Sequence, residues 1–245
     1  MSATGARLRD PLQRAERATQ ILDVAAELLL RHGYRRVTVD DVATGAGVGK
    51  GTIYLHWNNR EELFTAVFAR EVLRAVGELV QALQHDPGVC LLHRLARAYF
   101  LAIMNRPLLR GFIVTDADLL GKLAKPRGGA SEDRHRLMSR SYFQLLAERD
   151  LLRTDMNVDA IAYAFQATFE GFLHAEAATP VAMIAGEAQA SLDQRADLLA
   201  RTVERAFESR STIPRRVQQS LAGRVVDLLT QLTDADRGDL GLAET

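Results

Sequence analysis

Apolar residues recur every three or four positions along most of this chain of 245 residues. The first clear stripe of an amphipathic helix consists of Ala18, Ile21, Leu22, Ala25, Leu28 and Leu29. The alternation of apolar and polar residues that marks a half-buried strand lasts no more than a few positions, and comes nearest at 36–39. The sequence therefore predicts an all-α protein.

Glycines, prolines and capping residues divide this pattern into separate helices. Gly33 is placed to end the first helix, and Thr38-Val-Asp-Asp41 has the form of a capping box that opens a short one. A second short helix is expected at about 49–55, and Asn59 begins the cap of a long helix that runs towards a break at 85–88. Further helices are then expected over 89–105, 108–121, 131–150, 157–178, 189–208 and 215–232.

The charge of the chain is unevenly distributed. Lys+Arg and Asp+Glu both number 31, so the formal net charge is zero, which at first argues against a nucleic-acid partner. Residues 1–60, however, hold nine Lys/Arg against six Asp/Glu, a net charge of +3, and the remainder of the chain therefore carries −3. A basic N-terminal segment on a mildly acidic body suggests a local anion-binding face.

The sequence also suggests where the protein works. Cys90 is the only cysteine and cannot form a disulfide within the chain, which fits a reducing compartment. The polar segment 1–14 lacks the apolar stretch of a signal peptide, and no apolar run reaches the length of a membrane span. We expect a soluble cytoplasmic protein that does not enter a membrane.

The stretch 33–63 has the layout of a helix-turn-helix, in which a glycine turn joins two short helices. In the turn, Ala46 lets the helices approach, Gly47 can adopt a positive φ and Val48 fills the core. The second short helix then displays side chains that can reach DNA phosphates or base edges: Lys50, Thr52, Tyr54 and His56. The glycines at 49 and 51 let a partner approach the main chain at a helix start, where N–H groups are available to a phosphate.

This stretch resembles the DNA-binding domain of the TetR family of transcription regulators. The residues that carry the resemblance are Gly33-Tyr34, Thr38, Ala46-Gly-Val48, Gly51-Thr-Ile-Tyr54, His56-Trp57 and Asn59-Arg-Glu61. The match covers about residues 15–67. Two positions depart from the family pattern: Gly49 replaces a capping Ser or Thr, and Val37 stands where Thr is often found.

The resemblance implies both an organisation and a mechanism. We expect a flexible arm at 1–14, a three-helix helix-turn-helix domain at 15–60, a larger helical ligand-binding and dimerisation domain at 61–233, and a flexible tail at 234–245. Family members are similar in being homodimers that place two recognition helices in the major grooves of a roughly palindromic double-stranded DNA operator. A small-molecule effector bound in the helical body shifts the spacing of the two heads and releases the DNA.

These expectations assign site residues. The expected DNA-binding set is Thr38, Gly49, Lys50, Gly51, Thr52, Tyr54, His56, Asn59 and Arg60. The candidate effector-binding residues are Tyr99, Phe100, Phe112, Phe143, Phe165 and Phe169. Few charged residues interrupt 98–105 or 160–173, which favours a hydrophobic or aromatic effector. The apolar faces of 157–178 and 189–208 are expected to form the dimer interface, and helix 215–232 either extends that interface or caps the body.

Two other functions remain as alternatives. A phosphate-binding enzyme would use the glycine-rich stretch, but the spacing is wrong for a nucleotide loop: Gly51 follows Lys50 where Ser or Thr belongs, and Thr44 stands where the first glycine belongs. A helical dimerisation or adaptor module without DNA binding is the second alternative, for which Gly49 and Val37 are the only indications. Glu170 and His174 lie four residues apart on one expected helix, so a metal pair is geometrically possible, but the polar side of a dimer or pocket helix is favoured. No catalytic set or cofactor motif is recognised, and we expect a regulator that is not an enzyme.

Overall fold

The computed structural model describes residues 11–115, 130–177 and 191–240. The described chain is helical, as expected, and its only β interaction is an isolated bridge between Leu152 and Glu208. The helices are α1 (Pro11–His32), α2 (Val39–Gly45), α3 (Lys50–Tyr54), α4 (Arg60–His85), α5 (Leu92–Met104), α6 (Pro107–Thr115), α8 (Ala130–Ala147), α9 (Val158–Ala177), α10 (Leu192–Phe207) and α11 (Arg215–Leu240), with a 3-10 turn, η1 (Pro87–Cys90), between α4 and α5.

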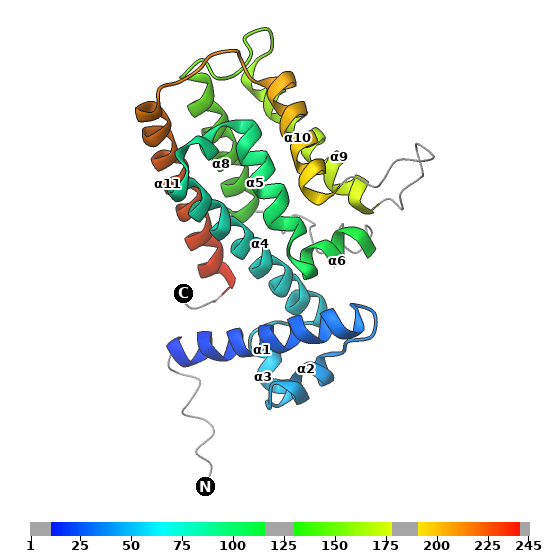
Figure 1. Ribbon diagram of the computed structural model, residues 1–245. Coiled ribbons are helices and arrows are strands. Elements are labelled where there is room, and N and C mark those ends of the chain that lie inside the picture. Colours follow the sequence, from blue (N-terminus) through cyan, green and yellow to red (C-terminus); the bar gives the residue numbers. More distant parts are fainter. Residues whose placement is uncertain (1–10, 116–129, 178–190, 241–245) are drawn as a thin grey trace, which may run out of the picture.

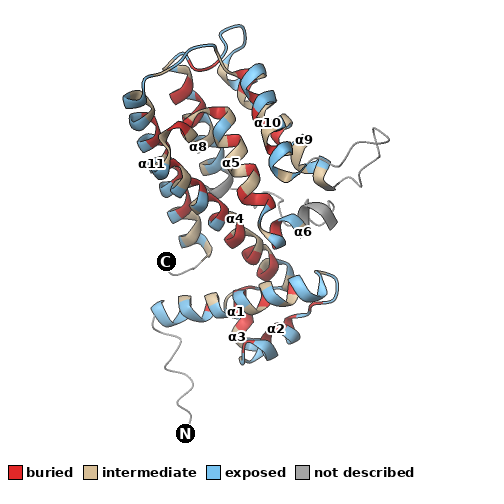
Figure 2. Cartoon of the chain, in the orientation of Figure 1, coloured by how far each residue is buried: buried red, intermediate tan, exposed pale blue. Residues whose placement is uncertain are grey.

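The buried residues form two hydrophobic cores (Figures 1 and 2). The smaller core lies mainly in α1–α3 and the first turns of α4, which we call the head, and Leu108 of α6 also packs into it. The larger core lies in the remaining helices, which we call the body. Helix α4 contributes to both, because Leu63, Phe64 and Val67 lie in the head core while Leu79 and Leu83 lie in the body core. A single continuous helix therefore joins the two units.

The boundaries of the head differ from the sequence prediction. Pro11–Arg14, expected in a flexible arm, belong to α1, which agrees with the preference of proline for the first turn of a helix. The head core also continues beyond residue 60 to Val67, because one face of the first two turns of α4 is apolar and packs on α1. The rest of the expected arm, 1–10, lies outside the described residues.

Helix α11 extends beyond its expected end at residue 232. Thr233 is buried, and Arg134 of α8 donates hydrogen bonds to Asp236 and Asp239, which holds the last turns against the body. Residues 234–240 of the expected tail are therefore helical, and 241–245 lie outside the described residues. Of the two roles left open for this helix, the structure shows packing on the body: α11 lies along α4, η1 and α8 (Figure 1).

The body helices fall close to their expected places, with one consequence for assembly. Leu199, Val203 and Phe207 of α10 were expected to face a second copy of the chain, but they are buried in the body core, where α10 packs on α5. Segment 108–121 is helical up to Thr115 as α6, and its remainder lies outside the described residues. No helix among the described residues is both long and apolar enough to cross a membrane.

Candidate nucleic-acid interface

Helix α2 begins with the capping box that the sequence predicts. The Thr38 side chain accepts a hydrogen bond from the Asp41 N–H at 3.2 Å, and the Asp41 carboxylate accepts from the Thr38 N–H at 2.8 Å. The Thr38 hydroxyl also donates to this carboxylate at 2.7 Å, and these hydrogen bonds lower the pKa of Asp41. Thr38 is therefore fixed at an exposed helix start, as expected for a residue near a phosphate.

The turn between α2 and α3 has the predicted construction. Gly47 adopts a φ of +63°, a conformation that side chains disfavour, and Ala46 before it is buried. The Val48 N–H donates to the Ala43 carbonyl at 3.0 Å, which closes the turn over the end of α2. Ile53 of α3 is 1% exposed and anchors that helix in the head core, so the direction of α3 is set by packing.

The face of α3 opposite Ile53 points away from the head. Lys50 and Tyr54 are exposed, and Thr52 is half-buried. Gly49 caps the helix without a side-chain hydrogen bond, and a Cβ at Gly49 or Gly51 would meet no atom within 4 Å. The protein itself therefore does not require glycine at these two positions, whereas close approach of a partner to the main chain would.

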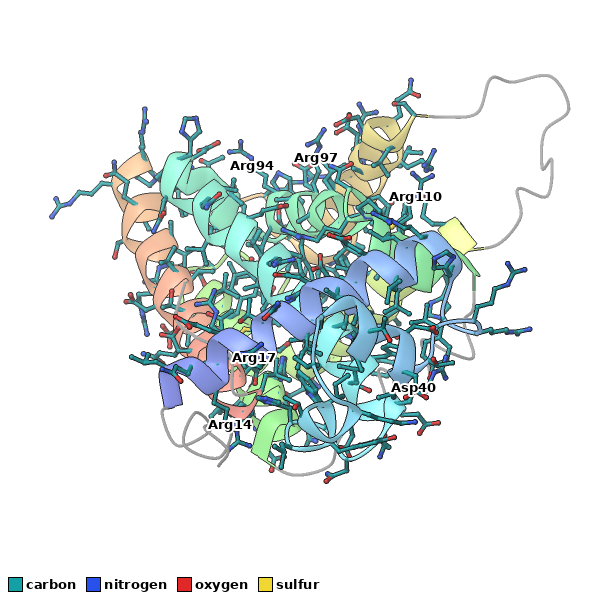
Figure 3. All side chains as sticks on the ribbon, turned by 90° about the horizontal axis from the view of Figure 1, so that it is seen from below. Arg14, Arg17, Asp40, Arg94, Arg97 and Arg110 are labelled. Atoms are coloured by element: carbon teal, nitrogen blue, oxygen red, sulfur yellow. The ribbon has the colours of Figure 1, made fainter. Side chains whose placement is uncertain are left out.

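Lys50 already has an anionic partner within the head. Its Nζ lies 2.8 Å from Oδ2 of Asp40, an exposed residue in the first turn of α2. This pair raises the pKa of Lys50. Figure 3 views this end of the molecule and labels Asp40, which the sequence analysis did not select.

Two residues predicted to contact DNA, Asn59 and His56, instead make their contacts within the head. Asn59 caps α4, where its Oδ1 accepts from the Glu62 N–H at 2.8 Å. His56 is half-buried beside Trp57, and its Nε2 is enclosed in the head without a hydrogen-bond partner among the described residues. Burial, followed by the positive charges of Arg14 and Arg17, lowers the pKa of His56. That Nε2 is therefore not presented to a phosphate in the free protein.

Arg60 departs most from its expected role as a phosphate ligand. Its guanidinium donates to the carbonyls of Val37, at 2.9 Å, and Tyr34, and stacks over the rings of Tyr34 and Phe64 at 4.3 and 4.9 Å. These contacts fasten the α1–α2 connection to α4. The sequence motif identifies Arg60 as a characteristic residue of the domain. It does not show that the side chain turns inward to two backbone carbonyls.

Two basic residues near α3 were missed by the sequence analysis. Arg14 donates to the carbonyl of Leu55, the residue that ends α3, at 3.1 Å, and Arg17 follows one turn later on α1 (Figure 3). The prediction placed Arg14 in a flexible arm, so its position beside the recognition helix was not considered. The proline at position 11, which starts helices readily, was the available signal.

Comparison with known proteins agrees with this geometry. Residues 21–67 match the model of a family described as bacterial regulatory proteins, tetR family. The matched residues run from α1 into the first turns of α4, so the family match is confined to the head. Among curated relatives, the HTH-type transcriptional activator FasR of Mycolicibacterium smegmatis is 38% identical over 82 residues, covering 34% of this chain and 37% of that protein. The fatty acid metabolism regulator protein of Bacillus subtilis is 31% identical over 74 residues, covering 30% and 36%.

These matches span only about a third of the relatives' length. The similarity in fold extends further. The fatty acid degradation regulator FadR from Bacillus halodurans aligns over 78% of this chain and 95% of its own, with a TM-score of 0.55 at 17% sequence identity. At this identity the comparison establishes the fold alone, which is the all-α arrangement of a small helical head and a larger helical body.

In the body, four of the six predicted effector-binding residues form one aromatic cluster. Tyr99 stacks on Phe169 at 5.6 Å, Phe169 on Phe165 at 6.0 Å, and Phe165 meets Phe143 edge-on at 5.6 Å. Phe100 is fully buried elsewhere in the core and makes no ring contact with these residues in the described chain. The side chain of Phe112 lies outside the described residues.

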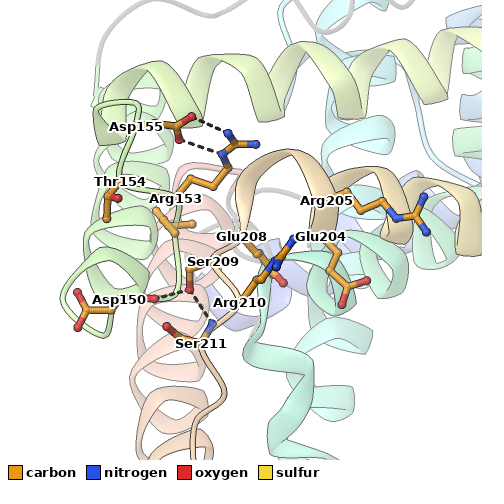
Figure 4. A pocket seen from close by; sticks show the side chains of 11 residues that line it. Asp150, Arg153, Thr154, Asp155, Glu204, Arg205, Glu208, Ser209, Arg210 and Ser211 are labelled. Carbon is orange, nitrogen blue, oxygen red and sulfur yellow. Dashed lines mark hydrogen bonds and ion pairs between the residues drawn. The ribbon is translucent and has the colours of Figure 1, made fainter.

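A large open groove of about 960 Å³ lies elsewhere, at the end of the body away from the head (Figures 1 and 4). The residues between α8 and α9 and those after α10 form its walls, which Ser209 links by donating a hydrogen bond to the Asp150 carbonyl. Arg153 and Asp155 pair at 2.5 Å on its rim. Its lining is mostly polar and charged, unlike the apolar site expected for a hydrophobic effector.

Proposed function

We propose that the chain is a ligand-responsive transcriptional regulator that binds double-stranded DNA through α3. The observation that carries this proposal is the exposed face of α3, with Lys50 and Tyr54 outward and Ile53 anchored inward, on a TetR-family head. A helix held in this way can enter a major groove while the capped start of α2 meets the backbone. We further propose that DNA binding represses transcription. Because a relative is named an activator, a transcription assay tests separately whether binding represses or activates.

The proposed regulator is a homodimer, and the outer face of α9 supports this. Tyr163 is 77% exposed, and Ala167, Gly171 and Ala175 follow it at intervals of four residues, all exposed. A Cβ at Gly171 would meet no atom within 4 Å, although glycine weakens a helix interior by about 1 kcal/mol relative to alanine. The close approach of a partner helix would explain this glycine, because small residues allow two helix backbones to come together.

The proposed effector is small and largely hydrophobic and binds in the body beside the aromatic cluster of Tyr99, Phe143, Phe165 and Phe169. Rings from α5, α8 and α9 meet there, so a ligand that separates them would move helices that also contact the head-proximal α6. Two relatives are named as regulators of fatty acid metabolism or degradation. A long-chain fatty acid and an aromatic compound of similar size are therefore suitable first probes.

The test is a gel-shift titration against the DNA upstream of the protein's own gene. We expect a saturable complex that Lys50→Ala and Tyr54→Ala each weaken at least tenfold, with a steep loss of affinity as salt rises. Arg153→Ala, which removes a basic side chain from the far end of the body, is the matched control and should bind as the wild type does. Absence of a specific complex, or equal binding by all variants, would contradict the proposal.

A further inference from the structure

A DNA-binding function leaves Asp40, beside the start of α3, unexplained. It lies in the first turn of α2, beside the start of α3, and its side chain is 67% exposed. A carboxylate in this position repels phosphate. The acidic residue needed to cap α2 is its neighbour Asp41, which closes the capping box with Thr38, so Asp40 is not required there.

Asp40 forms an ion pair with Lys50, a residue expected to contact DNA. Its Oδ2 lies 2.8 Å from Nζ of Lys50, whose side chain is 48% exposed. Lys50 is the only lysine in residues 1–60, so this pair engages the one flexible ammonium of the head. An ion pair this exposed is weak, because both charges are solvated, so DNA can break it.

The pair affects two kinds of DNA contact differently. A phosphate is an anion and repels the Asp40 carboxylate, so a contact of Lys50 with a phosphate places two anions beside one ammonium. An ammonium has three donors, so Lys50 can donate to the O6 or N7 of a guanine in the major groove and keep Asp40 as a second partner. The carboxylate therefore opposes phosphate contacts more than it opposes base contacts.

We propose that Asp40 is a specificity-determining residue, which holds Lys50 by an ion pair and so suppresses its contacts with phosphates of non-operator DNA. The proposal rests on the function proposed above and assigns a role to a residue that makes no favourable contact with DNA itself. It predicts that removing the negative charge improves binding to DNA of any sequence and reduces discrimination.

The test compares binding to a random 20-base-pair duplex and to the footprinted operator between 50 and 200 mM salt, by fluorescence anisotropy. For Asp40→Asn we expect about fivefold tighter binding to the random duplex per head, from the freed ion pair. The log–log salt slope should steepen by about 0.9 per head, because one more phosphate is neutralised. Operator affinity should rise less, so that the ratio of operator to random affinity falls.

Three further variants keep the interpretation unambiguous. Asp155→Asn removes the same charge from an exposed Asp–Arg pair on the body, and should change neither affinity nor slope. In a Lys50→Ala background, Asp40→Asn should leave the slope unchanged, because the ammonium that it would release is absent. Asp40→Ser keeps a residue suited to the start of a helix and serves as a second variant if Asp40→Asn disturbs folding. It should change affinity and salt slope as expected for Asp40→Asn.

The outcomes separate this proposal from the one on which it rests. Operator binding by the wild type with an unchanged ratio in Asp40→Asn and Asp40→Ser would overturn the role of Asp40 alone. A steeper slope for Asp40→Asn in the Lys50→Ala background would also overturn it, because the effect would then not pass through Lys50. Failure of the wild type to bind any DNA would overturn the proposed function, and this inference with it.

Discussion

The residues of the head divide into those that present chemistry and those that hold the presenting elements in place. Lys50 and Tyr54 are exposed on α3, as the sequence pattern indicates. Asn59 and Arg60 belong to the same motif but bind within the head. A motif identifies which residues are characteristic of a domain, whereas the direction of a side chain depends on neighbours from distant segments. The partner of Arg60, the Tyr34 carbonyl, is 26 residues away.

The contacts of Arg60 predict a stability effect. Arg60→Ala removes hydrogen bonds to two carbonyls and two stacking contacts, and should lower the free energy of unfolding by about 2 kcal/mol. Arg36→Ala removes an exposed arginine from the same connection and should change it by less than about 0.5 kcal/mol. Urea unfolding followed by circular dichroism measures both, and equal values would show that the Arg60 contacts are not stabilising.

The burial of His56 predicts a dependence of stability on pH. Its pKa in the folded protein is lowered below the usual value of 6.5, so the unfolded chain binds a proton more readily. The free energy of unfolding should therefore fall as pH drops below about 6.5, and this fall should level off below the folded pKa. His56→Gln should be less sensitive than the wild type between pH 7 and pH 5, whereas His85→Gln, at an exposed position, should match the wild type.

At the scale of elements, most helices were predictable because their apolar periodicity is strong. The ends of the helices, and the helices against which each one packs, were not predictable in this way. The apolar stripe of α10 indicates that the helix packs on something, but its burial against α5 rather than against a second copy depends on the arrangement of the body. The continuation of α11 to Leu240 depends on contacts with Arg134 of α8, which lie about a hundred residues away in the sequence.

The outer face of α9 gives a prediction about assembly. Gly171→Leu should fold at least as stably as the wild type, because a Cβ there meets no atom of the described residues within 4 Å, but should shift the protein from dimer to monomer in analytical ultracentrifugation. Gly223→Leu on α11 is the matched control, since its Cβ also meets nothing within 4 Å, and it should remain dimeric. A dimer that tolerates Gly171→Leu would place the interface elsewhere.

Helices α1 and α4 are also joined by a buried charge, which predicts an asymmetry between its two partners. The Arg70 side chain is 7% exposed and donates to the Asp23 carboxylate at 2.8 Å, while its Nε and Nη2 have no hydrogen-bond partner among the described residues. Asp23→Ala leaves a buried guanidinium without its carboxylate and should cost about 2 kcal/mol. Arg70→Met, which leaves only the half-exposed Asp23, should cost less than about 1 kcal/mol. Chemical denaturation of both variants checks this order, and the reverse order would contradict it.

At the scale of the whole molecule, several contacts join head and body. Helix α4 runs from one core into the other, and α6 contacts α1 on the head side and α9 on the body side. At the corner before α6, Arg106 pairs with Glu71 at 3.3 Å and Glu78 at 2.6 Å, so α6 is tied to the middle of α4. A shift of the body helices therefore has a direct route to the head, which is the property that a ligand-responsive regulator needs.

The zero net charge of the chain is compatible with DNA binding once its distribution is considered. The zero total combines a segment of charge +3 at residues 1–60 with a remainder of −3, and a homodimer would present the basic segment twice. Within the head, Asp40 and Asp41 limit the positive charge close to α3. We therefore expect weak binding to arbitrary DNA at physiological salt, and specificity that depends on a matched pair of sites.

The most direct test of the central claim is a hydroxyl-radical footprint of the wild-type protein on the DNA upstream of its gene. We expect two protected segments, related by two-fold symmetry and centred about one helical turn apart or at a related spacing. Lys50→Ala should weaken both segments together, since the same helix of each protomer makes each contact. Protection that lacks this symmetry, or no protection at protein concentrations that saturate the gel shift, would contradict it.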